Sequence, residues 1–289
     1  MTGKRIDAHQ HFWRYRAADY PWIGADMRAL ARDKLPDDLL PLLQAHGLNA
    51  SIAVQARAGR DETRFLLDLA NHADWIVGVV GWEDIAANDL AERLQAWRDE
   101  AKLIGFRHQV QDEADARAFL ALPDFNRGIS VLQSHGYVYD VLVFEHQLPA
   151  VAEFCARHDR HWLVLDHLGK PALREFSMAD GALTRWRNSL SALGKLPHVV
   201  CKLSGLVTEV DWSNGLRDTD IDHIHRCLDI ALETFGPQRL MFGSDWPVCL
   251  LGASYAQVVE LMTNWTDAHL TPDERADLWG GTASRCYAL

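Results

Sequence analysis

The stretch Ile76-Val77-Gly78-Val79-Val80-Gly81-Trp82 is short and almost entirely apolar. Its residues do not alternate between apolar and polar, so the stretch is typical of a strand in a parallel sheet that helices cover on both faces. An amphipathic segment precedes it at 61–73 and another follows at 88–100, each with apolar residues at helical spacing. The stretch therefore predicts one β-strand within an alternation of strands and helices.

The same alternation extends over the whole chain. Strands are expected near Ile6, Ile52, Val77, Leu103, Val138, Leu163, Val200 and Leu240. Helices are expected at 36–46, 61–73, 88–100, 125–134, 149–158, 183–193, 221–235, 254–265 and 272–279. This order predicts a single α/β domain, a (β/α)8 TIM barrel over residues 1–289. An open, doubly wound sheet is the alternative fold, although the G-x-G-x-x-G motif that accompanies many such sheets is absent.

Composition narrows the classes of partner. The formal net charge is −11 and no block of positive charges occurs, so neither nucleic acid nor an anionic membrane surface is an expected partner. No apolar stretch is long enough to span a bilayer. The five cysteines are scattered without a C-x-x-C pair, which favours a reducing compartment over a disulfide framework. We therefore expect a cytoplasmic protein that acts on a small molecule, with a homo-oligomer left open.

Polar residues follow nearly every predicted strand. In chain order they are His9 and His11, Gln55, Trp82 and Glu83, Arg107 and His108, Asp140, Asp166 and His167, Lys202 and Ser204, and Ser244 and Asp245. Active sites of such barrels lie at the C-terminal ends of the strands. Taken singly, Gln55, Glu83 and Asp140 are as readily explained as surface residues. The histidines and the acid that end the first, sixth and last strands together indicate a shared site.

The first strand ends in His9-Gln10-His11. Side chains alternate across a strand, so the two imidazoles point the same way and can share a cation or one substrate oxygen. A solvated histidine pair has the same pattern, but the distant apolar strand that ends in Asp245 favours the first interpretation. Between the first strand and the first helix, residues 12–35 show no clear element and are expected to form a lid or a pocket wall.

Four motifs carry a resemblance to a known family. They are Ile6-Asp7-Ala8-His9-Gln10-His11, Gly105-Phe106-Arg107-His108, Asp166-His167-Leu168-Gly169-Lys170-Pro171 and Phe242-Gly243-Ser244-Asp245-Trp246-Pro247. The chain resembles the amidohydrolase superfamily over essentially its whole length, and within it the amidohydrolase-2 branch of TIM-barrel lactonases. The group that acts on L-fuconolactone and L-rhamnonolactone is the most similar, with Arg107-His108-Gln109 as the pointer. Thr282 departs from the pattern of the branch, which usually has Asn there.

The resemblance implies a divalent cation at the mouth of the barrel. Its ligands would be His9, His11, His167 and Asp245, a set that suits zinc and leaves positions open for water. The fourth strand ends in Arg107 and His108, where many relatives have a bridging Lys, and the fifth ends near Asp140, where many have a His. One cation rather than two is therefore expected. Because some lactonases of this branch work without a metal, its need for activity is left open.

The resemblance also implies hydrolysis of a sugar-derived aldonolactone, L-fuconolactone or a close relative, to the aldonic acid. Asp245 would act as general base toward water, and Arg107 would polarise the carbonyl or bind substrate. His108 or His167 would protonate the departing ring oxygen. The expected substrate-binding residues are Gln55, Trp13, Glu83, Lys202 and Trp246.

Two other functions remain as alternatives. A metal-dependent decarboxylase of the same branch would share the His-x-His pair and the last Asp, but would usually carry a further His where the seventh strand here ends in Lys202. A non-catalytic sugar-binding protein could use the same fold, because fold does not fix function.

Overall fold

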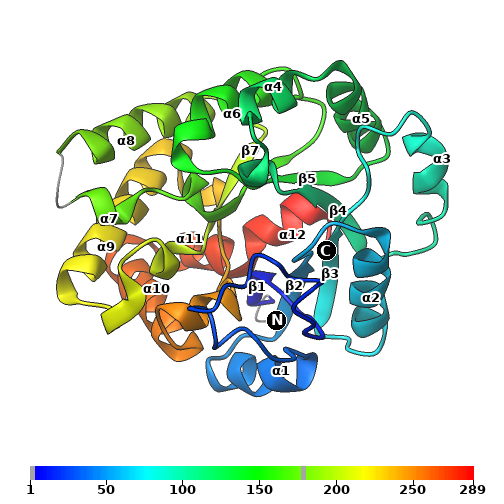
Figure 1. The fold of residues 1–289 in the computed structure, drawn as a ribbon. Helices are drawn as coiled ribbons and strands as arrows, with labels where there is room; N and C mark the ends of the chain where they lie inside the picture. The colour runs from blue at the N-terminus through cyan, green and yellow to red at the C-terminus, as the bar shows by residue number, and fades with distance from the viewer. Residues whose placement is uncertain (1–3, 177–179) are drawn as a thin grey trace.

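Eight parallel strands form one sheet that is nearly closed into a barrel and is surrounded by helices (Figure 1). This is the arrangement in the computed structural model of the protein, which describes residues 4–176 and 180–289. The strands are β1 (Ile6–Gln10), β2 (Ala50–Val54), β3 (Ile76–Gly81), β4 (Leu103–His108), β5 (Val138–Val141), β6 (Leu163–Leu165), β7 (Val199–Leu203) and β8 (Leu240–Phe242). Each strand pairs with the next in chain order. The predicted barrel is confirmed, and the open sheet is wrong.

The helices follow the predicted alternation. They are α1 (Pro36–Ala45), α2 (Arg60–Asn71), α3 (Leu90–Gln95), α4 (Ala116–Ala121), α5 (Pro123–Ser134), α6 (Leu148–Cys155), α7 (Leu173–Phe176), α8 (Asp180–Gly194), α9 (Asp218–Phe235), α10 (Tyr255–His269), α11 (Pro272–Ala276) and α12 (Thr282–Tyr287). The short helices α4, α7 and α12 were not expected from the sequence pattern. Among the described residues, no helix is both long and apolar enough to cross a membrane.

The helix expected at 88–100 is shorter in the structure, where α3 ends at Gln95. The next residues continue as turns, with the Trp97 N–H donating to the carbonyl of Leu94 at 3.0 Å. This tighter path lets the buried indole N–H of Trp97 donate to Glu83 Oε2 at 3.1 Å. A buried indole N–H needs such an acceptor, so the tertiary contact overrides the helical pattern.

The helix expected at 272–279 is α-helical only to Ala276 and continues as a single π-helical turn at Asp277–Gly281. Gly280 is needed in this turn because a Cβ there would lie 2.0 Å from the carbonyl oxygen of Lys4. The close approach seats the C-terminal segment against the start of β1.

The apolar core has two parts. One lies between the strands and the surrounding helices. The other fills the interior of the barrel toward the N-terminal ends of the strands, which we call the lower interior. Side chains from β1, β2, β3, β5, β6, β7 and β8 meet in the lower interior: Ile6, Ala8, Ile52, Val80, Val138, Val164, Val200 and Met241. Ala283, Cys286 and Tyr287 of α12 close it from below. The opposite, C-terminal end of the strands is left for polar groups.

Candidate active site

The first and last strands are joined by backbone hydrogen bonds at the barrel mouth. The Asp245 N–H donates to the His9 carbonyl at 2.8 Å, and the His11 N–H donates to the Trp246 carbonyl at 2.7 Å. The buried carboxylate of Asp7 adds a third link, because its Oδ1 accepts the Ser244 N–H at 2.8 Å. These bonds bring the His-x-His strand and the final Asp together, although they lie at opposite ends of the sequence.

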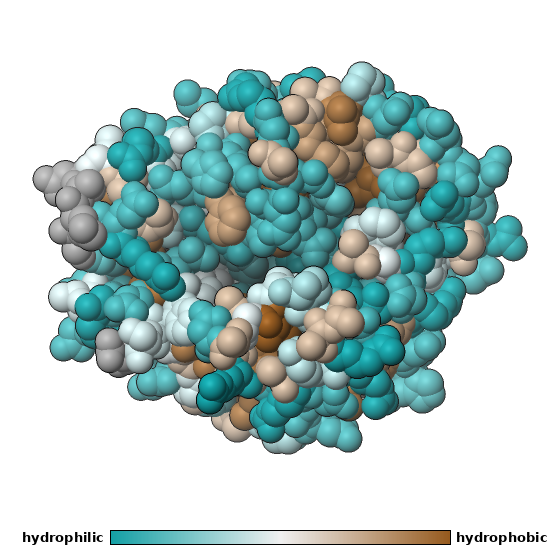
Figure 2. Space-filling model, in the orientation of Figure 1, coloured by the Kyte–Doolittle hydropathy of each residue, from teal (hydrophilic) through white to brown (hydrophobic). Residues whose placement is uncertain are grey.

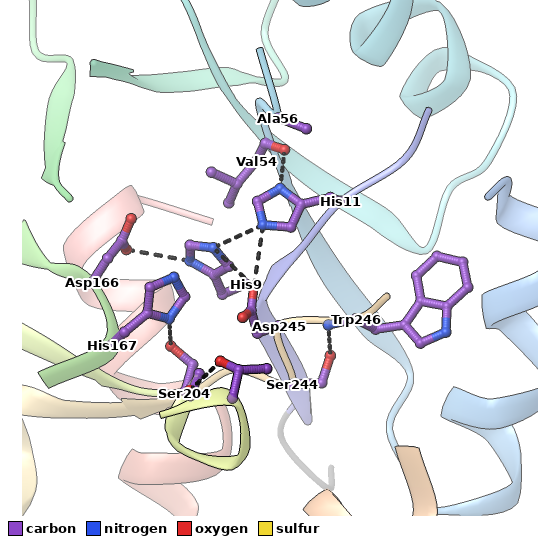
Figure 3. A network of polar contacts seen from close by, with 12 residues as sticks. His9, His11, Val54, Ala56, Asp166, His167, Ser204, Ser244, Asp245 and Trp246 are labelled. Atoms are coloured by element: carbon purple, nitrogen blue, oxygen red, sulfur yellow. Dashed lines mark hydrogen bonds and ion pairs between the residues drawn. The ribbon is translucent and has the colours of Figure 1, made fainter. Parts of the chain in front are cut away.

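His9, His11 and Asp245 form a compact buried triple (Figure 3). The Nε2 atoms of His9 and His11 are 3.2 Å apart. Asp245 Oδ1 lies 3.2 Å from His11 Nε2 and 3.8 Å from His9 Nε2. The other ring nitrogen of His11 faces the carbonyl oxygen of Val54 at 2.7 Å. Because a carbonyl oxygen can only accept, His11 Nδ1 is the donor in this contact, and Nε2 is the ring nitrogen that faces the triple.

His167 lies beside this triple rather than within it. Its ring packs against the ring of His9 with centroids 4.4 Å apart, and it forms a second buried group with His9 and Asp166. Its Nδ1 is 2.8 Å from the hydroxyl of Ser204 (Figure 3). Gly205 makes room for the ring, because a Cβ there would lie 2.6 Å from His167 Nδ1. Of the four predicted metal ligands, three therefore converge closely and the fourth is their neighbour.

A layer of buried charges supports His9 from below. Arg107 Nη1 donates to Asp166 Oδ2 at 2.9 Å. Lys202 Nζ donates to Asp140 Oδ2 at 2.5 Å and lies 3.2 Å from Asp166 Oδ1. The same ammonium and Asp166 Oδ1 each lie 3.2 Å from His9 Nδ1. The carboxylate accepts the Nδ1 proton, so His9 Nε2, which faces the donor Arg107 Nη1 at 3.3 Å, is the nitrogen with the free lone pair. In this layer two cations offset two carboxylates, as buried charges require.

Burial and neighbours set the protonation states of the site. Burial alone would raise the pKa of Asp245, but the imidazoles of His167, His11 and His9 outweigh it and hold that pKa below the ordinary value. Burial lowers the pKa of His9 well below its usual range and that of His167 to about 4. At neutral pH the site therefore holds an ionised Asp245 beside neutral His9 and His167 rings.

The donor set fits a divalent cation at His9 Nε2, His11 Nε2 and Asp245. Asp140 and Asp166 have Lys202 and Arg107 as partners, whereas the ion pairs of Asp245 among the described residues are with His9 and His11 only. Neutral imidazoles and an otherwise uncompensated carboxylate are suitable zinc ligands. The second group, with Asp166, fits less well because Lys202 already occupies that side of His9.

A cavity of about 470 Å³ opens above the triple. Figure 2 shows the molecular surface hollowed near the middle of this face. Among the residues that line the cavity, His11, Arg107, His167 and Asp245 form its floor, and the others include Trp22, Met27, Gln109, Lys170, Arg174, Glu209, Trp212, Val248 and Leu251. A cavity of this size holds a small organic molecule with room to spare.

Comparison with known proteins agrees with this geometry. The family model described as amidohydrolase matches residues 6–289. The chain belongs to the amidohydrolase family. An L-fucono-1,5-lactonase of Burkholderia multivorans is 67% identical over 100% of this chain and 97% of its own length. An L-fucono-1,5-lactonase of Burkholderia ambifaria is 33% identical over 99% of this chain and 96% of its own length.

A solved structure adds a metal to this comparison. It is the crystal structure of an amidohydrolase from Burkholderia multivorans with bound zinc, which is 67% identical and matches with a TM-score of 0.97. The match covers 99% of this chain and 100% of that one. A close member of the amidohydrolase family therefore binds zinc.

Several predicted substrate-binding residues lie under the cavity rather than in its lining. Lys202 is fully buried in the charge layer. Gln55 is also buried, donates to the Arg107 carbonyl at 3.1 Å and exchanges hydrogen bonds with the Gln109 side chain. Lys202 thus contacts His9, and Gln55 contacts the backbone of Arg107, beneath the cavity lining.

Other predicted residues face away from the cavity. His108 turns to the outer side of β4, where its Nε2 is 2.7 Å from Glu113 Oε1 and its ring stacks on Phe119 at 4.7 Å. The reason is strand alternation: Arg107 points inward, so its neighbour points outward. Glu83 is buried against Trp97 and Arg60 outside the barrel.

The two tryptophans proposed to bind substrate are packing residues. Trp13 is fully buried and donates its indole N–H to the Arg32 carbonyl at 2.9 Å. Trp246 is buried and packs edge-on against Phe12. Neither is among the residues that line the cavity.

The structure adds lining residues that the sequence analysis missed. Trp22 comes from the segment 12–35, which was expected to be a lid or pocket wall and does contribute to the wall. Lys170 and the α7 residue Arg174 follow β6 in the chain, and Glu209 and Trp212 follow β7. Burial raises the pKa of Glu209, against the opposing charges of Lys170 and Arg174. Their position after strand ends is the signal that could have identified them. However, a sequence pattern does not show where the side chains of residues several positions beyond a strand end will point.

Proposed function

We propose that this amidohydrolase is a lactonase that hydrolyses a sugar-derived aldonolactone, with L-fucono-1,5-lactone as the best-supported substrate. The 67% identity to an L-fucono-1,5-lactonase over the whole chain carries the proposal. The cavity supports it, because its volume of about 470 Å³ is enough for a monosaccharide lactone and its lining includes Asp245 and Arg107.

Asp245 takes the proton of the attacking water in this proposal. It is ionised, lines the cavity, and is held in place by His11 and by its own backbone bond to His9. A carboxylate with a lowered pKa is a weak base, so the water needs a positive neighbour that makes it more acidic. Once protonated, the same carboxyl group is a strong acid and can return its proton to the departing ring oxygen.

Arg107 supplies fixed positive charge at the cavity floor. Its guanidinium is buried and anchored to Asp166, so it cannot turn away when charge develops on the carbonyl oxygen. A pre-oriented donor of this kind stabilises a tetrahedral intermediate. His167 lines the same floor, and its neutral ring can hydrogen-bond to the substrate.

A divalent cation, if bound, would be held by His9, His11 and Asp245 and would acidify water and polarise the carbonyl. The roles given to Arg107 and Asp245 do not require the cation. How much a bound cation adds to the rate is measured by comparing activity with and without chelator. The crystal structure of the similar amidohydrolase with bound zinc supports zinc as the cation.

The two alternatives have less support. A decarboxylase would need a further catalytic His at the end of β7, but that position holds Lys202, buried in the charge layer away from the cavity lining. A non-catalytic binding protein would not need an ionised carboxylate among neutral imidazoles on the cavity floor.

Hydrolysis of a panel of aldonolactones, followed by acid release with and without chelator, tests the proposal. We expect L-fucono-1,5-lactone to be among the best substrates. Asp245→Asn keeps the shape but removes the proton acceptor, so kcat should fall by about 10²–10⁴-fold. The matched control Asp68→Asn, at an exposed position on α2, should keep full activity. A folded Asp245→Asn enzyme with most of its activity would refute the general-base role, and a wild-type protein inactive on every lactone would refute the function.

A further inference from the structure

The cavity has two unlike sides. On one side, Trp22, Met27, Val248 and Leu251 form what we call the apolar wall. On the other, Gln109, Lys170, Arg174 and Glu209 form the polar wall. Figure 2 shows the same contrast, with hydrophilic residues above the hollow and a hydrophobic patch below it, where Figure 1 draws the dark-blue segment after β1.

The apolar wall adjoins the reacting end of the cavity. Val248 begins a short 3-10 turn, Val248–Leu251, that follows Asp245 closely in the chain. The Cys249 N–H donates to the Asp245 carbonyl at 2.9 Å, which ties this turn to the catalytic residue. A ligand group placed beside the proposed general base therefore meets the wall.

The wall is part of a continuous apolar cluster. Met27, Val248 and Leu251 pack against a buried group that contains Trp13, Tyr20, Ile23, Leu30 and Ala56. Trp22 is fixed over the same region, since its indole N–H donates to the Ala56 carbonyl at 3.1 Å. These contacts use the polar part of Trp22 and leave the wall without a described side-chain partner for a ligand hydroxyl, apart from the exposed Asp26 at the mouth.

The other apolar residues of the cavity are covered by polar groups. The Phe144 ring lies beneath the ammonium of Lys170, 5.1 Å from the ring centroid. Lys170 Nζ also donates to Gln111 Oε1 at 2.7 Å, and the Gln111 N–H donates to the Leu142 carbonyl at 3.0 Å. That side therefore offers hydrogen bonds rather than a dry surface.

We infer that the apolar wall binds the methyl group of a 6-deoxy sugar lactone and selects this substrate over the analogue with a hydroxymethyl group. The inference rests on the proposed lactonase function. In a 1,5-lactone the methyl-bearing carbon is bonded directly to the ring oxygen, which is bonded to the carbonyl carbon. When the carbonyl sits beside Asp245, C2 with its hydroxyl and C5 with its methyl group both lie near it. The apolar wall suits the methyl group, and the polar groups of the cavity suit the hydroxyl.

The polar wall then faces the ring hydroxyls. Glu209 accepts hydrogen bonds while Lys170 and Arg174 donate them, a combination that suits a ring with several hydroxyl groups. A hydroxymethyl group at the apolar wall would have to bury its hydroxyl without a good partner. An apolar pocket rejects an added hydroxyl only moderately, so we expect a preference of about 10–100-fold in kcat/KM.

The test compares kcat/KM for L-fucono-1,5-lactone and L-galactono-1,5-lactone, which differ by that one hydroxyl. Val248→Thr keeps the shape of the side chain and adds a hydroxyl to the wall, so the preference for the methyl substrate should fall by about threefold to tenfold. Met27→Gln, in the segment 12–35, should shift the ratio in the same direction and is a second variant should Val248→Thr not fold.

Val131→Thr is the matched control, since Val131 is half-buried on α5 and does not line the cavity. Its ratio should equal that of the wild type. If the wild type hydrolyses both lactones equally well, or if the ratio is the same in the folded wall variants, the inference is overturned while the lactonase function stands. A wild type inactive on both lactones would refute the function itself.

Discussion

The lower and upper halves of the barrel interior are built on the same strands but from opposite kinds of residue. On β5 and β7, and across the end of β6, a buried valine is followed two positions later by a buried charge: Val138 and Asp140, Val200 and Lys202, and Val164 and Asp166. Residues two apart on a strand point to the same side, so the valines form one layer and the charges form the next. The lower layer is apolar and closed by α12, while the upper layer borders the active site.

The two layers differ in what holds them together. Apolar side chains need only close packing, and the lower layer supplies it. The Tyr287 hydroxyl of α12 is different, since it donates to Asp140 Oδ1 at 2.8 Å. The charged layer is stable only because each ion has an opposite neighbour, and removing one leaves the others buried and unpaired. A barrel needs no such layer for stability. Its presence under His9 indicates that it serves the site.

Removing Lys202, one of the two cations of the upper layer, should give the largest effect on folding. Lys202→Met removes the buried ammonium that pairs with Asp140 and Asp166. The free energy of unfolding should therefore fall by about 3–5 kcal/mol at pH 7.5. Met241→Ala, in the lower layer, should cost a similar amount, about 2–5 kcal/mol, by leaving a cavity. Urea unfolding followed by circular dichroism measures both.

The stability losses of Lys202→Met and Met241→Ala should differ in how they depend on pH. Burial already raises the pKa of Asp140 to about 6, despite the lowering by Lys202, so without Lys202 it should rise further. In the Lys202→Met variant, the carboxyl group of Asp140 can then be protonated at pH 5.5, and part of the lost free energy of unfolding should return. The loss in Met241→Ala should not depend on pH. If the free energy of unfolding of both variants depended on pH in the same way, the proposed difference between a charged layer and an apolar layer would be wrong.

The edge of the upper layer offers a sharper test of geometry. Gly205→Ala places a methyl group where only 2.6 Å separates it from His167 Nδ1, so the ring must move. Displacement of a group at the cavity floor should lower kcat/KM by roughly tenfold to 100-fold. Gly136→Ala is the control, because Gly136 also has a positive φ, 78°, but has nothing near the added Cβ. Both variants should lose about 1–2 kcal/mol from backbone strain, and only Gly205→Ala should lose activity.

Glu62 shows what happens to a buried carboxylate outside the barrel. It accepts the Ala56 N–H at 3.0 Å, but burial still raises its pKa to about 7 from an ordinary value of 4.5. The folded state thus binds the proton more tightly than the unfolded state. Its contribution to stability is complete below pH 4.5 and is lost as pH rises through 7, by up to about 3 kcal/mol.

Glu62→Gln should remove this contribution to the pH dependence of Tm, measured between pH 4.5 and 8. The exposed Glu153→Gln should leave the wild-type curve unchanged. A Glu62→Gln curve that falls as steeply as the wild type between these pH values would contradict the assignment.

The smallest effect is expected on the outer side of β4. His108 neighbours Arg107 of the cavity lining in sequence but stacks on Phe119 and pairs with Glu113. His108→Ala should therefore change kcat/KM by no more than about twofold, whereas Arg107→Ala should lower it strongly. A large loss in His108→Ala would place the histidine back among the candidates for the proton donor.

The strand positions and the converging residues His9, His11 and Asp245 could be predicted because they follow from local patterns. Apolar runs define the strands, and a polar residue at a strand end has only two directions to point. His108 and Glu83 show the limit of this reasoning, since one residue of register decides whether a side chain enters the barrel or leaves it. The polar wall was beyond prediction, because Arg174 on α7 and Glu209 lie several residues beyond the ends of β6 and β7, and the path of these segments depends on tertiary contacts.

Burial depth was also not readable from the sequence. Lys202 and Gln55 were expected to bind substrate, but neither is among the residues that line the cavity, and they contact His9 and the Arg107 carbonyl. A strand-end position cannot tell a group that contacts substrate from a group that supports such a contact. Only the packing of neighbouring strands decides between the two.

The bond from the Ser244 N–H to Asp7 joins residues 237 positions apart in the chain. During synthesis, the half of the site on β1 leaves the ribosome first and the half on β8 follows only after almost the entire barrel has been made. A nascent chain therefore cannot assemble this centre piece by piece, and closing such a long loop is a slow event in folding. Recovery of activity after denaturation should accordingly lag behind recovery of secondary structure, with the docking of β8 on β1 as the last step.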